Sequence, residues 1–406
     1  MDNKTPLSSI YRNAVSMTAI LGGLLLAATG LLAATRQAQA VRTSLHVDLI
    51  GWQRVNTDGF GDTNTYGAAG SLAVFNGQLY SGATNWSGVG ASLWRTADGL
   101  NWTSVMTNGF GQFSLNPAIL GMLVFDGQLY AGTGWWAGAP GQLWRSPDGT
   151  TWSQITGNGI GTSTGGVFAF TVYSDTLYFG TCGAPGGIDG AQIWRSTTGD
   201  SLSWTNVVTS GNTTTDNVCI TGLETFGGAL YATVENESTG AQIWRSLTGA
   251  RGTWTQVNQS GFGAPTNIQA GKMAGFNGEM YVGTRNLSTG AQLWRSENGT
   301  AWHSVMTDGF GDINNQKVET LFVFEGVLYA FLDNEVTGME VWQSRDGMSW
   351  HQVNPDGFGD SNNKSIWANE VTNFDNSLYL GVHNDVTGVE IWRYNEKIVY
   401  LPMIIR

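Results

Sequence analysis

Short apolar and aromatic runs separated by glycine turns recur along the chain from about residue 52. The stretch Gly290–Trp302, GAQLWRSENGTAW, has two such runs on either side of Asn298-Gly299. An Asn-Gly pair favours a two-residue hairpin, because both central residues of a type I′ turn need positive φ. The pattern therefore predicts two antiparallel strands joined by a tight turn.

Versions of this hairpin recur at a period close to 50 residues. The first tryptophan of the hairpin occurs as Trp94, Trp144, Trp194, Trp244, Trp294, Trp342 and Trp392. A second motif ends in a tyrosine, at Tyr80, Tyr130, Tyr178, Tyr231, Tyr281, Tyr329 and Tyr379. An apolar run and a tight turn precede most of these tyrosines, so each period predicts four strands. This pattern is typical of a β-propeller of the kelch size class.

The two ends of the repeat region are complementary. Trp52–Val55 has the pattern of a fourth strand, and Ile391–Tyr394 that of a third strand without its fourth. Pairing them would leave no open sheet edge. We therefore predict an all-β fold, a seven-bladed β-propeller of four-stranded antiparallel blades over residues 52–395, with Trp52–Val55 completing the last blade. Residues 41–51 form an N-terminal extension and residues 396–406 a C-terminal tail.

Residues 1–40 have the pattern of a signal peptide. A basic start is followed by the uncharged, mostly apolar stretch Asn13–Thr35, and Ala38-Gln39-Ala40 fits a cleavage site. The uncharged stretch is also long enough to span a bilayer, so an N-terminal membrane anchor is the alternative. Both interpretations predict a secreted or cell-surface protein.

The composition argues against two classes of binding partner. The net charge of −12 argues against nucleic acid and against anionic lipid, so no membrane contact is expected beyond a retained anchor. The 18 tryptophans and 57 glycines fit a large aromatic core with many turns.

The turn of the hairpin resembles a known repeat. Ser146–Trp152, SPDGTTW, is similar to the Asp-box, or BNR repeat, of sialidase-like propellers, with one residue fewer between Asp and Gly. The resemblance implies fold more than activity, because the box lies far from the active site in that family. A sialidase would also need three arginines that converge on a carboxylate. Only Arg285 is expected on the face that carries the long loops, so sialidase activity is not predicted.

The long loops are expected on the face opposite the Gly turns, which we call the loop face. An Asn recurs there after the tyrosine, either to bind the loop backbone or to contact a ligand. Exposed Trp beside amides and carboxylates suits sugar rings, although these side chains could also be packing and solvated charge. The candidate ligand-binding residues are Trp86, Trp135, Trp136, Glu235, Asn236, Glu237, Arg285, Asn286, Asp333, Asn334, Glu335, His383, Asn384 and Asp385.

The crossings between repeats contain Gly-Phe-Gly, flanked by acid in three copies, as at Asp58 and Asp62. Such oxygens could hold Ca²⁺, but the spacing lacks the ligand alternation of a known calcium loop. We therefore expect no cofactor. The favoured interpretation is that Phe fills the seam between blades and Asp caps a turn.

Two classes of function follow. The first is a non-catalytic extracytoplasmic propeller that binds glycan or an extracellular protein on the loop face. The second is a glycan-cleaving hydrolase or lyase that uses the carboxylates Glu235, Glu237, Asp333, Glu335 and Asp385. The four histidines do not cluster, so neither a zinc site nor a Ser-His-Asp triad is predicted.

The only two cysteines, Cys182 and Cys219, are expected on the loop face in neighbouring blades. In an oxidising compartment they predict a disulfide. The alternative is two buried free thiols.

Overall fold

The structure, a computed structural model, describes residues 51–65, 71–85, 87–134, 141–157, 164–183, 190–209, 216–366 and 370–395. The chain divides into two compact units, Met1–Val47 and Asp48–Arg406, and every described residue belongs to the second. The described residues form β-strands and short 3-10 turns without an α-helix, which agrees with the predicted all-β fold. None of their helices is long and apolar enough to cross a membrane. The predicted signal segment and C-terminal tail lie outside these residues.

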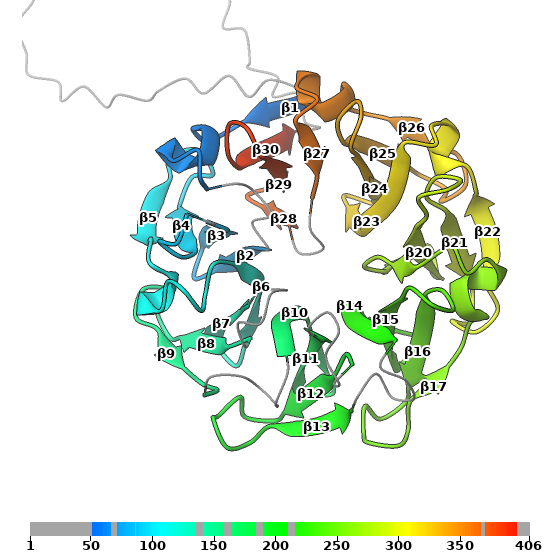
Figure 1. Ribbon diagram of the computed structural model, residues 1–406, viewed down its shortest axis with the longest axis horizontal. Helices are drawn as coiled ribbons and strands as arrows, with labels where there is room; N and C mark the ends of the chain where they lie inside the picture. Colours follow the sequence, from blue (N-terminus) through cyan, green and yellow to red (C-terminus); the bar gives the residue numbers. More distant parts are fainter. Residues whose placement is uncertain are drawn as a thin grey trace, which may run out of the picture. The chain divides into compact units, whose positions relative to one another are not determined.

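Antiparallel hairpins join the described strands into groups that succeed one another in chain order (Figure 1). Group 1 contains β2 (Ser71–Phe75), β3 (Gln78–Ala83), β4 (Ser92–Thr96) and β5 (Thr103–Met106). Group 2 contains β6 (Ile119–Phe125), β7 (Gln128–Thr133), β8 (Leu143–Ser146) and β9 (Ser153–Gln154). Group 3 contains β10 (Thr164–Tyr173), β11 (Thr176–Gly183), β12 (Ile193–Ser196) and β13 (Thr205–Val208). Group 4 contains β14 (Asn217–Phe226), β15 (Ala229–Asn236), β16 (Gln242–Ser246) and β17 (Thr255–Gln256).

The later groups follow the same plan. Group 5 contains β18 (Gln269–Ala270), β19 (Ala274–Phe276), β20 (Glu279–Arg285), β21 (Leu293–Ser296) and β22 (His303–Met306). Group 6 contains β23 (Asn315–Phe324), β24 (Val327–Asn334), β25 (Glu340–Ser344) and β26 (His351–Gln352). Group 7 contains β27 (Asn363–Ser365), β28 (Val371–Phe374), β29 (Ser377–Asn384) and β30 (Glu390–Asn395).

The strand β1 (Gly51–Arg54) pairs with β30, the last of the described strands. The register sets Trp52 opposite Tyr394 and Arg54 opposite Trp392, and the Val55 amide donates to the Ile391 carbonyl at 2.8 Å. This is the predicted pairing of the two ends. Because β27 and β28 both pair with β29 and so share one strand position, β1 gives group 7 the strand beyond β30 that its own sequence lacks.

Neighbouring groups touch where the second strand of one meets the first strand of the next. Groups 3 and 4 join at Cys182 and Cys219, which lie opposite each other and form the predicted disulfide. Groups 5 and 6 join at the equivalent position, where Arg285 lies opposite Lys317.

The repeated tyrosines form the centre of the core. All seven are at most 1% exposed. The Tyr80 hydroxyl of group 1 lies beneath the turn glycine Gly149 of group 2, so a Cβ at Gly149 would overlap it. Tyr379 of group 7 lies beneath Gly99 of group 1 in the same way. Each of these glycines also has positive φ, which disfavours any other residue.

The Gly-Phe-Gly crossings form the 3-10 turns η1 (Asp58–Gly61), η2 (Gly109–Gly111), η3 (Ser260–Gly263), η4 (Gly309–Gly311) and η5 (Asp356–Gly359). Their phenylalanines pack on a tryptophan of the next group. Phe60 stacks on Trp94 with ring centroids 4.6 Å apart, and Phe358 on Trp392 at 4.4 Å. The phenylalanines therefore fill the seams, as predicted.

One local prediction was wrong. Among the described residues, Asn298 is not in the positive-φ region, so Asn298-Gly299 is not a type I′ turn. Six residues separate β21 from β22, and the Asn298 side-chain oxygen accepts hydrogen bonds from the amides of Thr300 and Ala301 at 2.9 and 2.8 Å. Its side chain thus caps a longer turn. Asn76-Gly77 does have the two positive φ angles of a type I′ turn.

Candidate functional site

The fourth residue after each tyrosine lies at or next to the end of a second strand, near the junction between groups. This position differs from one repeat to the next. It is Cys182, Glu235, Arg285, Asp333 and His383 in groups 3 to 7. The fifth residue is Asn in groups 4 to 7. The repeat therefore keeps this Asn constant, while the side chain before it differs in charge and chemistry from one group to the next.

Four predicted site residues from three groups meet in one hollow of about 270 Å³. Its lining consists of Arg285, Leu287, Gln316, Lys317, Asp333, Glu335, Ser365 and His383. Groups 5, 6 and 7 therefore build it together, from the ends of second strands and the starts of first strands. These connections belong to the loop face.

Arg285 provides a cation with few partners. Its only ion pair with a described residue is to Glu235, with 3.9 Å between Nη1 and Oε1. The Arg285 side chain is 35% exposed, whereas that of Glu235 is only 6% exposed. Burial raises the pKa of Glu235, and its second oxygen has no hydrogen-bond partner among the described residues.

Lys317 and Asp333 face each other across β23 and β24. Lys317 forms an ion pair with Glu319. Burial opposes the charge on Lys317, but the Glu319 and Asp333 carboxylates outweigh it and raise the Lys317 pKa. Burial also raises the pKa of Asp333, and the nearby Glu319 adds to that shift. The Ile366 amide donates to Asp333 at 3.3 Å. Asp333 is therefore biased towards its protonated form.

The remaining charged groups of the hollow are paired at its rim. His383 Nε2 lies 2.5 Å from Asp385 Oδ1, and Lys364 Nζ lies 3.4 Å from Glu335 Oε2. The Nδ1 atom of His383 is buried without a hydrogen-bond partner among the described residues. Asp385 and Glu335 are exposed, so both pairs remain in contact with solvent.

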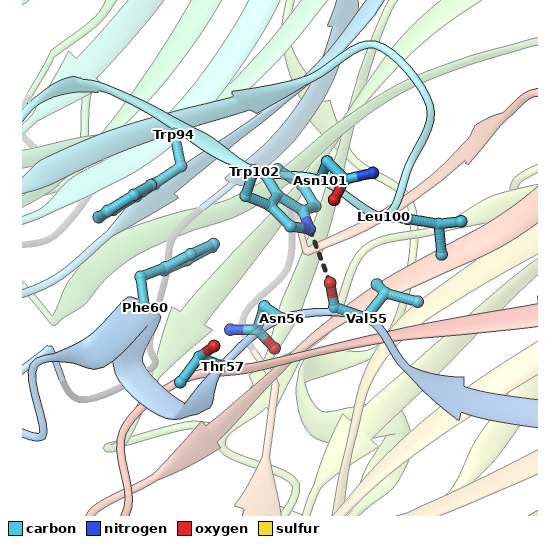
Figure 2. Close-up of a pocket in the computed structure, with 8 residues that line it drawn as sticks. All are labelled: Val55, Asn56, Thr57, Phe60, Trp94, Leu100, Asn101 and Trp102. Carbon is cyan, nitrogen blue, oxygen red and sulfur yellow. Dashed lines mark hydrogen bonds between the residues drawn. The ribbon is translucent and has the colours of Figure 1, made fainter. Parts of the chain in front are cut away.

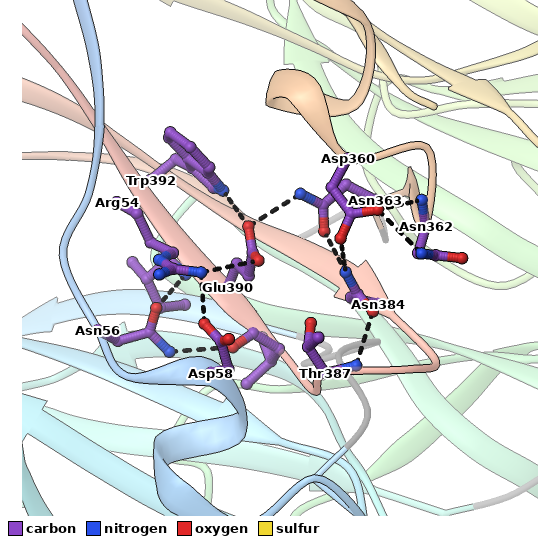
Figure 3. Close-up of polar contacts among 12 residues, drawn as sticks. Arg54, Asn56, Asp58, Asp360, Asn362, Asn363, Asn384, Thr387, Glu390 and Trp392 are labelled. Carbon is purple, nitrogen blue, oxygen red and sulfur yellow. Dashed lines mark hydrogen bonds and ion pairs between the residues drawn. The ribbon is translucent and has the colours of Figure 1, made fainter. Parts of the chain in front are cut away.

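The repeated asparagines instead hold the loops. Asn236, Asn286, Asn334 and Asn384 are at most 1% exposed. Asn384 accepts from the Thr387 amide at 2.9 Å and donates to Asn363 at 2.9 Å and to Asp360 at 3.2 Å (Figure 3). Their donors and acceptors are used within the protein, which favours the backbone-binding interpretation.

The acids of the crossings are used in the same way. Asp360 accepts from the Asn362 amide at 2.9 Å, and Asp312 from the Asn314 amide at 2.9 Å. No cluster of three or more His, Cys, Asp or Glu side chains in the described part of the chain is arranged to hold a metal ion.

A second kind of hollow belongs to the seams. Figure 2 shows one of about 390 Å³, with Phe60 against Trp94 and the Trp102 indole nitrogen donating to the Val55 carbonyl at 3.0 Å. A hollow of about 640 Å³ repeats the arrangement around Phe262, Trp294 and Trp302. The aromatic residues of both hollows already pack between groups, so we interpret these hollows as a consequence of the repeated fold.

Sequence reasoning missed half of the lining. Gln316, Lys317 and Ser365 come from first strands, and Leu287 is an exposed loop residue. Lysine usage was an available signal: between residues 51 and 395 the lysines are Lys272, Lys317 and Lys364, all in first-strand segments of groups 5 to 7. Among the predicted residues, Glu237 is exposed outside this lining, while Trp86, Trp135 and Trp136 lie outside the described residues.

Comparison with known proteins supports the fold. A family model described as the DUF6242 beta propeller domain matches residues 249–391. No curated protein was found to match the chain. The repeat architecture and this match identify a β-propeller fold.

Several solved structures are similar at low sequence identity. A GH74 xyloglucanase from Xanthomonas campestris is 18% identical, with a TM-score of 0.51 over 84% of this chain and 53% of that one. An ancestral GH74 enzyme is 13% identical, with a TM-score of 0.56 over 86% and 50%. The polysaccharide lyase Uly1 is 10% identical, with a TM-score of 0.50 over 89% and 96%. The chain thus spans about half the length of the two GH74 structures, and the likeness concerns the fold alone.

Proposed function

We propose that the chain is an extracytoplasmic seven-bladed β-propeller whose loop-face hollow binds a glycan without cleaving it. The strand groups are its blades, and β1 closes the last one. The pairing of β1 with β30 supports closure, because it matches the pairing of third and fourth strands within the other groups. The contact of Tyr379 with Gly99 supports closure too, because the same tyrosine–glycine contact joins successive groups, such as Tyr80 with Gly149.

The hollow around Arg285 and His383 is the observation that carries the binding function. It lies close to the lower size limit of about 300 Å³ for small-molecule sites. Gln316 and Ser365 offer neutral hydrogen-bonding groups for sugar hydroxyls, and Leu287 offers an apolar wall for ring carbons. Sites of this kind, with a few converging polar groups on a rigid frame, suit small ligands.

Two further observations fit this proposal. The Cys182–Cys219 disulfide suits an oxidising compartment, in agreement with the predicted signal segment. Two of the similar folds are named as a xyloglucanase and a polysaccharide lyase, which favours glycan over protein as the ligand class.

Glycan cleavage is the second candidate, and the raised pKa of Asp333 favours it. A carboxyl that stays protonated near neutral pH can donate a proton to a departing sugar oxygen, and Glu335 is a second carboxylate in the same hollow. Against this, Glu335 is exposed and paired with Lys364. These features make Glu335 a poorly preorganised catalytic base.

A glycan array and a cleavage screen on the same oligosaccharide panel test the proposal. Binding without new reducing ends or unsaturated products supports it. Turnover that disappears in Asp333→Asn but persists in the control Glu297→Gln, in a hairpin turn outside the hollow, would establish cleavage instead. Failure to bind any glycan on the array and in solution would refute both functions.

A further inference from the structure

We propose that the sugar bound in this hollow carries a carboxylate, as a hexuronate does, and that Arg285 and Lys317 bind that group. This inference rests on the proposed glycan function and names the class of sugar. Arg285 and Lys317 come from neighbouring blades but lie opposite each other in register, and both line the hollow. The strand pairing therefore brings two cations to one small space.

Arg285 has donors available for a ligand. Some other described arginines lie closer to a carboxylate: Arg295 is 2.5 Å from Glu279, and Arg145 is 3.0 Å from Asp200. The 3.9 Å separation of Arg285 from Glu235 is longer, and the described residues give the Arg285 side chain no hydrogen bond. A planar guanidinium with free N–H groups suits a carboxylate, which it can bind through two parallel hydrogen bonds.

The distribution of cations points to the same sector of the protein. The chain has a net charge of −12 and only five lysines, at positions 4, 272, 317, 364 and 397. Lys317 lines the hollow, and Lys364 pairs with Glu335 at its rim. Two of the five lysines of this acidic protein therefore lie in or beside the hollow that Arg285 lines, where they provide local attraction for an anion.

The carboxyl groups of the hollow do not cancel this attraction. Asp333 is biased towards its neutral form by burial, and Glu335 and Asp385 each have a cationic or imidazole partner. Glu319 forms an ion pair with Lys317, and Glu235, whose pKa is raised by burial, lies 3.9 Å from Arg285, so each cation keeps donors that its own carboxyl neighbour does not use. A ligand carboxylate between Arg285 and Lys317 would therefore meet hydrogen-bond donors.

Matched acidic and neutral ligands test the inference. The ligands are oligogalacturonates, oligomannuronates and a glucuronate-containing oligosaccharide, each paired with its carboxyl-reduced form, which keeps the linkage but replaces the carboxylate with a primary alcohol. Calorimetry on the purified chain gives both affinities. We expect at least one acidic form to bind about tenfold or more tightly than its reduced form, the scale of a charge-assisted hydrogen bond.

The variant Arg285→Gln should bring this acidic-to-reduced ratio close to one. The control Arg251→Gln, at an exposed turn residue outside the hollow, should leave the ratio unchanged. Because the ratio compares two ligands on one protein, a modest loss of folded fraction in a variant does not alter it. Raising the salt concentration should also lower the ratio.

The outcomes separate the two proposals. Equal binding of acidic and reduced forms, or an unchanged ratio in Arg285→Gln, would overturn the carboxylate inference and leave glycan binding standing. Absence of binding by every acidic and neutral sugar would overturn glycan binding itself.

Discussion

Removal of the N-terminal strand should destabilise the whole propeller. The change is a deletion of residues 41–56, which eliminates β1 and the residues that follow it. The matched control is a deletion of residues 41–50, which leaves β1 intact. If the chain is a closed ring, the first deletion leaves β30 as an open edge, whereas the control does not.

The contacts of the deleted segment give the size of the effect. Trp52 packs on Phe358 and Tyr394, with ring centroids 5.2 and 5.0 Å apart, and such pairs contribute about 0.5–1.5 kcal/mol each. Val55 is 7% exposed, and its burial contributes about 1.5–3 kcal/mol. Asn56 bonds the backbone of Val389 and Ile391, and each hydrogen bond contributes about 1 kcal/mol.

Together these contacts amount to about 6 kcal/mol, a large share of the roughly 5–15 kcal/mol that stabilises most folded domains. We expect the melting temperature to fall by about 10 °C or more, measured by calorimetry at equal protein concentration. Light scattering should also report association through the open edge. A melting temperature within about 2 °C of the control would refute the closure.

Three further predictions concern the disulfide and the pKa shifts. Unfolded, unreduced protein should show no free thiol by titration, and two free thiols per chain would contradict the disulfide. Replacing Cys182 and Cys219 with Ser should lower the free energy of unfolding by about 3–4 kcal/mol, as expected for a sequence separation of 37. Backbone amides that donate to Asp148 and Asp346 lower the pKa of both, so their stabilisation is present above pH ~4 and lost as pH falls through the lowered values. Urea midpoints from pH 5 to 2 should therefore fall more steeply for the wild type than for Asp148→Asn/Asp346→Asn, and parallel curves would exclude this role. Burial raises the pKa of Asp333, so ionisation of Asp333 costs stability as the pH rises from about 4 through the raised value. The Asp333→Asn variant should therefore be more stable than the wild type at pH 7 but not at pH 3. An equal difference at both pH values would contradict the raised pKa.

The repeat architecture was predictable because its information is local and recurs. The spacing of Trp94 and its equivalents gives the period, and the tyrosine motif gives a second fixed point in each repeat. The pairing of Trp52–Val55 with Ile391–Tyr394 followed from the phase of the chain ends. The disulfide followed from two cysteines at matching ends of strands in adjacent repeats.

The site was only partly predictable, because it depends on contacts between repeats. Arg285, Asp333, Glu335 and His383 stood out as variable residues in a repeated frame. Lys317 did not, since only the register between β20 and β23 sets it opposite Arg285. Sequence could not assign pKa shifts either, because burial and neighbouring charge determine them. The predicted turn type at Asn298 was wrong, because hydrogen bonds to the Asn298 side chain, rather than a positive φ at Asn298, stabilise the turn.

The pairing of β1 with β30 also affects the order in which the chain can fold. Arg54 and its partner Glu390 are 336 residues apart, so the ribosome releases one long before the other is synthesised. The repeats between them can pair locally as they emerge, but β1 must wait unpaired until β30 has been synthesised. The last group therefore completes its pairing only after the groups between have been made, and a chain that lacks β30 retains an unpaired strand that holding chaperones and quality-control proteases can recognise.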